Sequence, residues 1–134
     1  MPPAAEVFAS YTYRQLSRVA EVAFFAVSDE YTPTEVRRLL SDGSVQLIDV
    51  RQTDEHEAGH IAGSRLIELA DLPAQAATID RDRPVILYCR SGARSEMATE
   101  ALLQAGYDAH NMRGGMLEWQ AAGLEMEPAD GHVL

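Results

Sequence analysis

The sequence predicts an α/β fold, in which a mostly parallel central sheet carries helices on both faces. Short apolar segments with strand character alternate along the chain with segments of helical character. Several of the strand segments are apolar throughout, which is typical of strands buried on both sides of a parallel sheet. The chain has 134 residues, 46% of them apolar, so it can form one ordinary domain with a real core but not two.

The first helix of this domain is expected to begin after Thr32. Thr32 can serve as the N-cap, Pro33 suits the first helical position, and Glu35 completes a capping box. Gly43 marks the region where this helix should end.

The later elements are expected to alternate in the same way. We expect strands at residues 45–50, 64–69, 83–89 and 108–112, and helices at 53–59, 70–79, 95–106 and 114–123. The segment 83–89 (RPVILYC) is the clearest strand, because Pro84 stands at its start, where a missing N–H does least harm.

The first 30 residues differ from the rest and are predicted to form an N-terminal helical extension. The main domain is then expected at residues 31–128 and a loose C-terminal tail at 129–134. The extension carries apolar residues at helical spacing along one face, namely Leu16, Val19, Ala20, Ala23, Phe24 and Val27. Such a helix can pack on its own domain or on a second copy, so a homodimer is one of two open alternatives.

Charge and composition restrict the partners and the location. The formal net charge of −10 disfavours nucleic acids and anionic membrane surfaces, so an anionic ligand must be held locally. The most apolar N-terminal stretch, residues 19–30, contains Glu21 and is shorter than the ~20 residues that span a bilayer. A single cysteine cannot form an internal disulfide, which favours a reducing compartment. We therefore expect a cytoplasmic protein.

The only cysteine, Cys89, ends the clearest predicted strand and opens an acid-free segment with two arginines. In open α/β sheets, ligands bind beyond the carboxyl ends of the strands. Loop amides and the N-terminus of the next helix create a positive potential there, which favours a thiolate and holds an oxyanion. We predict Cys89 as a nucleophile and the following loop residues as substrate-binding, namely Arg90, Ser91, Gly92, Ala93, Arg94 and Ser95.

A buried structural cysteine is the plain alternative, because free cysteines are commonly buried and inert. The absence of acids from the loop, together with its two arginines, argues against this alternative.

Four segments of the chain resemble the rhodanese-like domains, in that family's order. They are residues 47–51 (LIDVR), 55–67 (EHEAGHIAGSRLI), 88–95 (YCRSGARS) and 111–119 (NMRGGMLEW). The resemblance extends from about residue 31 to residue 127 and leaves the first 30 residues outside. Ala62 stands where the family usually has Pro, and Ser64 where it usually has Ala, which affects a turn and not the chemistry.

The resemblance implies a thiosulfate sulfurtransferase. Cys89 would take the outer sulfur of thiosulfate or a similar donor as a persulfide and pass it to a thiophilic small molecule or a protein acceptor. Arg90 and Arg94 would then hold the sulfonate oxygens, since a guanidinium offers paired donors to planar anions. We expect no cofactor, and no metal, because no second Cys or His stands at ligand spacing.

Two other functions remain open. One is a persulfide carrier or sensor module that depends on a partner protein. The other is a Cys-based phosphatase or arsenate reductase, but those phosphatases use a Cys-x5-Arg loop. Here the sixth position after Cys89 is Ser95, and Arg94 comes one residue earlier, so the shorter loop suits sulfur chemistry better.

Four further side chains have expected roles outside the Cys89 loop. Arg51, at the end of the first strand motif, is either a contributor to the pocket or bound in an ion pair with Glu55 or in a backbone contact. His60 is expected to be structural, Trp119 to belong to the core, and Arg113 to be structural instead of lining the rim.

Overall fold

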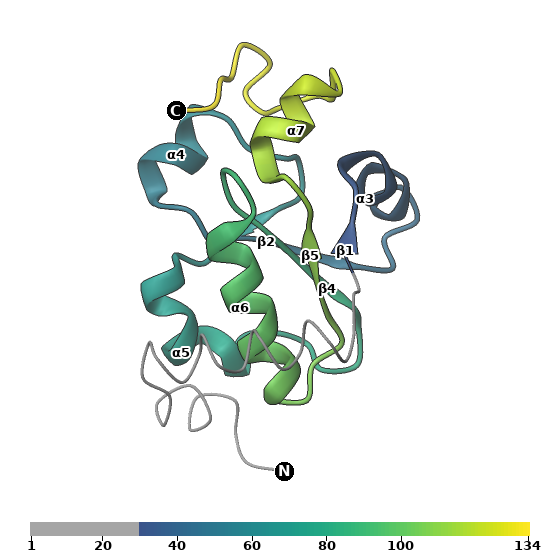
Figure 1. The fold of residues 1–134 in the computed structure, drawn as a ribbon, viewed down its shortest axis with the longest axis vertical. Coiled ribbons are helices and arrows are strands. Elements are labelled where there is room, and N and C mark those ends of the chain that lie inside the picture. Colours follow the sequence, from purple (N-terminus) through teal and green to yellow (C-terminus); the bar gives the residue numbers. More distant parts are fainter. Residues whose placement is uncertain (1–29) are drawn as a thin grey trace.

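The computed structural model describes residues 30–134 of the chain (Figure 1). The helix predicted for the N-terminal extension, with its apolar stripe, lies outside the described residues. Glu30 alone of that extension is described, and it belongs to a strand.

Five strands form one sheet in which every pairing is parallel, in the order β1-β5-β4-β2-β3. The strands are β1 (Glu30–Tyr31), β2 (Gln46–Asp49), β3 (Arg65–Leu66), β4 (Val85–Tyr88) and β5 (Ala109–Met112). The predicted α/β class with a mostly parallel sheet is confirmed. The short β1 was not predicted, because two residues carry too little pattern to reveal a strand; β1 is held by its pairing with β5.

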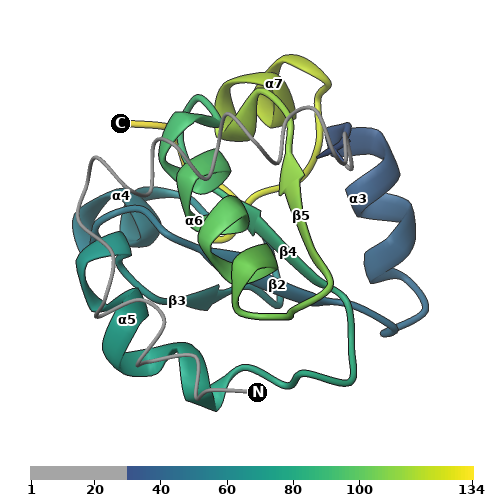
Figure 2. The ribbon, with the colours of Figure 1, turned by 60° about the horizontal axis from the view of Figure 1, so that its bottom comes forward.

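Helices cover both faces of the sheet, and Figure 2 shows α6 lying over the strands. The helices are α3 (Pro33–Leu40), α4 (Thr53–Ala58), α5 (Leu72–Gln75), α6 (Ala93–Gln104) and α7 (Gly115–Ala121), with 3-10 turns η1 (Leu69–Asp71) and η2 (Ala76–Thr78). The single helix expected at residues 70–79 is therefore one α-helical turn between two 3-10 turns.

Strand β4 is apolar throughout because both of its faces are covered by helices. Val85 and Leu87 pack with α5 and α6, whereas Ile86 and Tyr88 pack with α3 and α7. Successive side chains of a strand point to opposite faces, so a strand between two helical layers buries every residue. All four β4 side chains have an exposed fraction of 0%, which places the end of this strand inside the molecule.

The start of α3 matches the sequence prediction in atomic detail. The Glu35 N–H donates to Thr32 Oγ1 at 3.2 Å, and the Thr32 N–H donates to Glu35 Oε1 at 3.1 Å. These two bonds form the predicted capping box and satisfy two N–H groups that a helix start leaves free.

The C-terminal segment differs from the loose tail that was expected. Glu127 and His60 exchange two backbone hydrogen bonds of 2.8 and 2.9 Å, and the His132 N–H donates to the Ala58 carbonyl oxygen at 2.9 Å. The segment thus runs along the end of α4, and Val133 packs against the core. Its polar composition indicated a loop, but only tertiary contacts fix its path.

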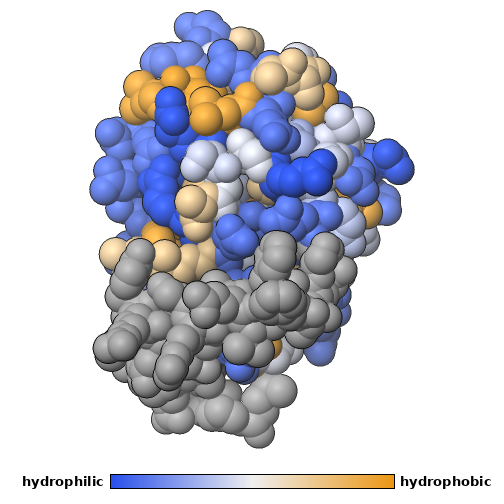
Figure 3. All heavy atoms as spheres, viewed as in Figure 1, coloured by the Kyte–Doolittle hydropathy of each residue, from blue (hydrophilic) through white to orange (hydrophobic). Residues whose placement is uncertain are grey.

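The face of the described residues that is visible in Figure 3 is largely hydrophilic, with an apolar patch at the end where α7 and the C-terminus lie. Within residues 30–134, no helix is both long enough and apolar enough to span a membrane.

Candidate active site around Cys89

Cys89 lies immediately after β4, at the carboxyl edge of the sheet, and α6 begins four residues later. The residue is buried, with an exposed fraction of 1%. Its position between a central strand and a helix N-terminus follows from the sequence, because the apolar strand ends at the cysteine and Gly92 opens the helix.

Three donors converge on the Cys89 sulfur. The Gly92 N–H lies 3.1 Å from Sγ, the Ser95 N–H 3.5 Å, and the Ser95 hydroxyl 3.4 Å. All three come from the N-terminal end of α6, where the helix dipole also places positive potential. This arrangement stabilises negative charge on the sulfur, whether on the thiolate or on a sulfur atom attached to it.

Gly92 makes the tight turn between Cys89 and α6. Its φ of 103° lies in the left-handed region, which side chains other than glycine rarely adopt. A Cβ at this position would also lie 3.3 Å from the Gly114 nitrogen. The turn therefore requires glycine, and it directs the Gly92 N–H at the sulfur.

Backbone hydrogen bonds join the loop after Cys89 to the start of α7. The Met116 N–H donates to the Cys89 carbonyl oxygen at 2.9 Å, and the Leu117 N–H donates to the Arg90 carbonyl oxygen at 3.0 Å. A Cβ on Gly115 would lie 2.5 Å from the first of these oxygens and 2.6 Å from the second. Gly115 thus allows α7 to approach the loop, a role that the sequence signalled only as a pair of adjacent glycines.

Arg94 is bound by Glu55 of α4. Its Nη1 and Nη2 lie 2.8 and 2.9 Å from the two oxygens of the Glu55 carboxylate, in a bidentate pair. This hydrogen bonding is the main reason why the pKa of Glu55 is lowered, and it raises the pKa of Arg94. The side chain that the sequence assigned to a substrate oxyanion therefore already has an anionic partner.

The remaining predicted loop residues have no hydrogen bond to the sulfur in the structure. Arg90 is exposed, and its Nε donates to the Leu134 carbonyl oxygen at 2.7 Å. Ser91 and Ala93 are exposed as well. Of the predicted loop residues, only Gly92 and Ser95 have hydrogen-bond contacts with Sγ.

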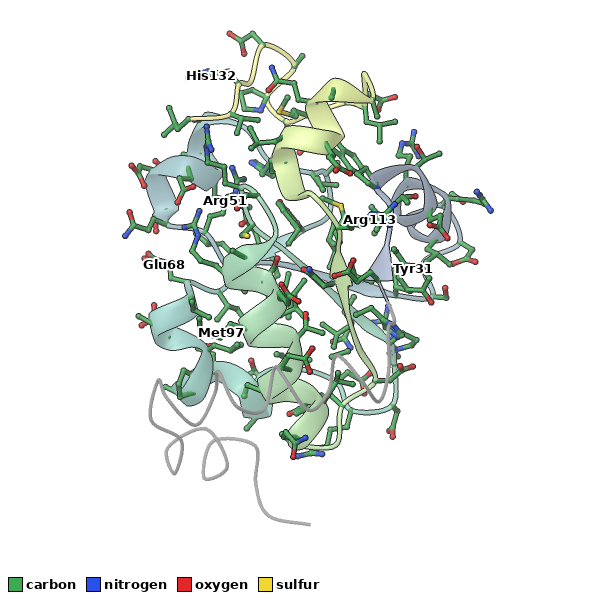
Figure 4. All side chains as sticks on the ribbon, viewed as in Figure 1. Tyr31, Arg51, Glu68, Met97, Arg113 and His132 are labelled. Carbon is green, nitrogen blue, oxygen red and sulfur yellow. The ribbon has the colours of Figure 1, made fainter. Side chains whose placement is uncertain are left out.

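Arg51 is fully buried and pairs with Asp49, two residues earlier. Its Nε lies 2.9 Å from Asp49 Oδ1, and its Nη2 lies 2.7 Å from Asp49 Oδ2 and 2.8 Å from the Gly59 carbonyl oxygen. Figure 4 shows Arg51 between α4 and the sheet. The ion pair involves Asp49 and not the expected Glu55, and Arg51 ties the end of β2 to the end of α4.

The histidines beside this ion pair have structural contacts. His56 Nδ1 lies 2.8 Å from Asp49 Oδ2, and His60 Nδ1 lies 2.8 Å from the His56 carbonyl oxygen, with the two rings stacked 3.9 Å apart. The described residues contain no group of three or more His, Cys, Asp or Glu side chains arranged to hold a metal ion.

Trp119 has the core position that was expected, whereas the Arg113 side chain is exposed and its structural role stays a prediction. Trp119 is 1% exposed, and its indole N–H donates to the Glu125 carbonyl oxygen at 2.8 Å. The Arg113 backbone N–H donates to the Tyr31 carbonyl oxygen at 2.9 Å, and so joins the end of β5 to β1.

Comparison with known proteins gives a consistent result. The family model of the rhodanese-like domain matches residues 32–122. A thiosulfate sulfurtransferase, GlpE of Pseudomonas aeruginosa, is 32% identical over 99 residues, which cover 73% of this chain and 86% of that protein. A crystal structure of a rhodanese-like domain protein from Staphylococcus aureus has a TM-score of 0.64 and 32% identity, over 68% of this chain and 90% of that one.

A further relative is named as a transcriptional regulator and not as a sulfurtransferase. The HTH-type transcriptional regulator Rv0324 of Mycobacterium tuberculosis is 39% identical over 102 residues. The match covers 74% of this chain but only 45% of the length of that regulator.

Proposed function

The chain belongs to the rhodanese-like domain family, and we propose on this premise that it is a sulfurtransferase that carries sulfane sulfur on Cys89. The observation that carries the proposal is the convergence of the Gly92 N–H, the Ser95 N–H and the Ser95 hydroxyl on Sγ of the only cysteine. Donors in this position stabilise both the attacking thiolate and a persulfide that replaces it.

The proposed first step uses thiosulfate or a similar donor. The Cys89 thiolate attacks the outer sulfur of the donor, and a new S–S bond forms to Sγ. The bond between the two sulfur atoms of thiosulfate breaks, and its electron pair leaves with sulfite. The persulfide formed on Cys89 keeps its negative charge beside the N–H groups of α6.

In the second step, a thiophilic acceptor attacks the outer sulfur of the persulfide. The electron pair of that S–S bond returns to Sγ, and the thiolate is restored. The acceptor is a small thiophile such as cyanide or a thiol, or a cysteine of a protein. Neither step consumes an oxidant or reductant, because sulfane sulfur is only passed from one nucleophile to another.

Mass spectrometry tests the covalent step. Thiosulfate should add one sulfur atom, about 32 Da, to the intact protein, and cyanide should remove it. The Cys89→Ser variant should remain unmodified. Ser44→Ala is a suitable control, because Ser44 is exposed and precedes β2, outside the Cys89 loop, and it should form the adduct like the unmodified protein. An adduct that persists in Cys89→Ser would refute the proposal.

A second candidate function is a persulfide carrier or sensor that needs a partner protein. It is supported by the transcriptional regulator, which is similar to this chain over less than half of its own length. A carrier would form the Cys89 adduct but turn over slowly with thiosulfate and cyanide. Multiple turnovers by the isolated protein would favour the enzyme over the carrier.

A further inference from the structure

We propose that Glu55 is a specificity-determining residue of the Cys89 site. Its carboxylate keeps Arg94 engaged and so favours sulfur donors of low negative charge, such as thiol persulfides, over dianions that carry a sulfonate. This inference rests on the proposed sulfur transfer, because it concerns the donor class of the same site.

The first observation is that the Glu55–Arg94 pair uses both terminal nitrogens of the guanidinium. Nη1 lies 2.8 Å from Oε1 and Nη2 lies 2.9 Å from Oε2. A sulfonate would bind a guanidinium through the same two parallel donors. A donor that needs Arg94 must therefore displace the carboxylate or remain close to its negative charge.

The second observation is that Glu55 is held in place from its own side. Its Oε1 also accepts the Gln52 N–H at 3.1 Å, at the start of α4. The Glu55 side chain is only 14% exposed, whereas the Arg94 side chain is 36% exposed. The Glu55 carboxylate is consequently held in one position between α4 and α6.

The third observation is that the pair lies within electrostatic reach of the reacting sulfur. Glu55 is the main cause of the raised pKa of Arg94, and Cys89 and Asp49 add smaller contributions. The second loop arginine is also engaged, since Arg90 Nε donates to the Leu134 carbonyl oxygen. Both loop arginines thus have protein partners, and the site attracts anions less than its two arginines suggest.

A thiol persulfide satisfies these conditions. The Cys89 thiolate attacks the outer sulfur of R–S–SH, a bond forms between that sulfur and Sγ, and the S–S bond of the donor breaks. The electron pair leaves with the thiolate RS⁻, and the proton remains on the transferred sulfur. No sulfonate has to be accommodated beside Glu55 in this step.

The test compares two alkylating reagents of similar shape that differ by one charge. Iodoacetate and iodoacetamide both transfer a carbon to Sγ and release iodide, so the ratio of their rates reports how the site treats an anion. In Glu55→Gln this ratio should rise roughly fivefold, since one charge a few ångströms away is removed. Glu57→Gln removes an equal charge from an exposed position of the same helix and should leave the ratio unchanged.

The same variants should differ in their choice of sulfur donor. Thiosulfate is a dianion and methanethiosulfonate a monoanion; they release sulfite and methanesulfinate respectively. The rate of adduct formation with thiosulfate relative to methanethiosulfonate should rise in Glu55→Gln and stay constant in Glu57→Gln. An unchanged alkylation ratio, or equal losses with both donors, would overturn the assignment of Glu55 and leave sulfur transfer intact.

The alkylation arm is independent of sulfur transfer. A raised alkylation ratio without any sulfur adduct would refute the proposed function but keep the discrimination against anions. Salt gives a second comparison between the same two proteins. Potassium chloride should raise the ratio of iodoacetate to iodoacetamide rates more steeply in the unmodified protein than in Glu55→Gln, because it screens the negative charge of the carboxylate. An equal salt dependence in the two proteins would overturn the proposal.

Discussion

At the scale of single residues, Ser95 has the closest connection to Cys89 among the side chains of the loop. Its hydroxyl lies 3.4 Å from Sγ and 3.2 Å from the Gly92 carbonyl oxygen, so its single proton is shared between these two acceptors. Its N–H is a second donor to the sulfur. The hydroxyl therefore links the charge on sulfur to the turn that positions the other donor.

We expect Ser95→Ala to lower kcat/KM for sulfur transfer roughly tenfold or more, because a hydrogen bond to a charged group contributes about 1.5–3 kcal/mol. Steady-state kinetics with thiosulfate and cyanide measure this effect. Thr99→Val is the matched control, since its hydroxyl bonds the Ser95 carbonyl oxygen in the same helix and has no contact with Sγ. Equal losses in the two variants would mean that helix integrity, and not the hydroxyl beside sulfur, sets the rate.

The structure identifies the partners of Arg51, which the sequence left open. Its sequence context allowed an ion pair with Glu55 or a backbone contact, and the structure gives an ion pair with Asp49 and a backbone contact with Gly59. Arg51 follows the end of β2, and its backbone N–H donates to Asp49 Oδ1 at 3.0 Å, so this ion pair is a local contact between residues two apart. Glu55 instead pairs with Arg94, which lies 39 positions away in the sequence.

At the scale of elements, the active loop depends on α7 as much as on β4 and α6. Two N–H groups at the start of α7 bind the carbonyl oxygens of Cys89 and Arg90. This satisfies two backbone acceptors and fixes the backbone on which the sulfur donors are arranged. The paired glycines before Met116 are therefore part of the site, although they do not touch the sulfur.

We expect Gly115→Ala to lower the free energy of unfolding by more than about 2 kcal/mol and to impair adduct formation, because the new Cβ would meet two backbone oxygens of the loop. Gly123→Ala provides the control. Gly123 also has a positive φ, of 73°, but a Cβ there would have no neighbour within 4 Å, so only about 1 kcal/mol should be lost and sulfur transfer kept. Urea unfolding and the mass of the thiosulfate-treated variants test both points. Adduct formation at the normal rate in Gly115→Ala would show that the loop tolerates displacement.

At the scale of the whole molecule, the excess of acids has a consequence for stability. Glu100 of α6 is only 7% exposed. Burial, followed by the charges of Glu96 and Glu30, raises its pKa from 4.5 to about 7. Between these two values the folded protein holds a proton that the unfolded chain has released, so stability falls as the pH rises through this range.

We expect Glu100→Gln to raise the free energy of unfolding on the order of 1–2 kcal/mol at pH above about 7, since the neutral amide avoids the buried charge. The gain should be smaller below the ordinary pKa of 4.5, where the Glu100 carboxyl is largely protonated in both the folded and the unfolded protein. Urea unfolding of the two proteins across this pH range measures the difference. A difference that stays constant with pH would contradict the raised pKa of Glu100.

The sequence alone predicts the order and type of nearly all the elements of the main domain. Local signals sufficed: the apolar run of β4, the capping box at Thr32, and the glycines at the helix ends. It also placed Cys89 at the carboxyl end of a buried strand, where a parallel sheet exposes strand ends to a ligand. These features arise from residues that are close in the sequence, so they can be recognised without knowledge of the tertiary fold.

Contacts between distant parts of the chain set which groups surround the sulfur and what the two loop arginines bind. Arg94 reaches Glu55, 39 positions away, and Arg90 reaches Leu134, 44 positions away. The ordered C-terminal segment and the short β1 also depend on contacts with distant parts of the chain. A charged side chain on a flexible stem can satisfy several partners, and which partner it meets is set by the packing of α4, α6 and the tail around the end of the sheet.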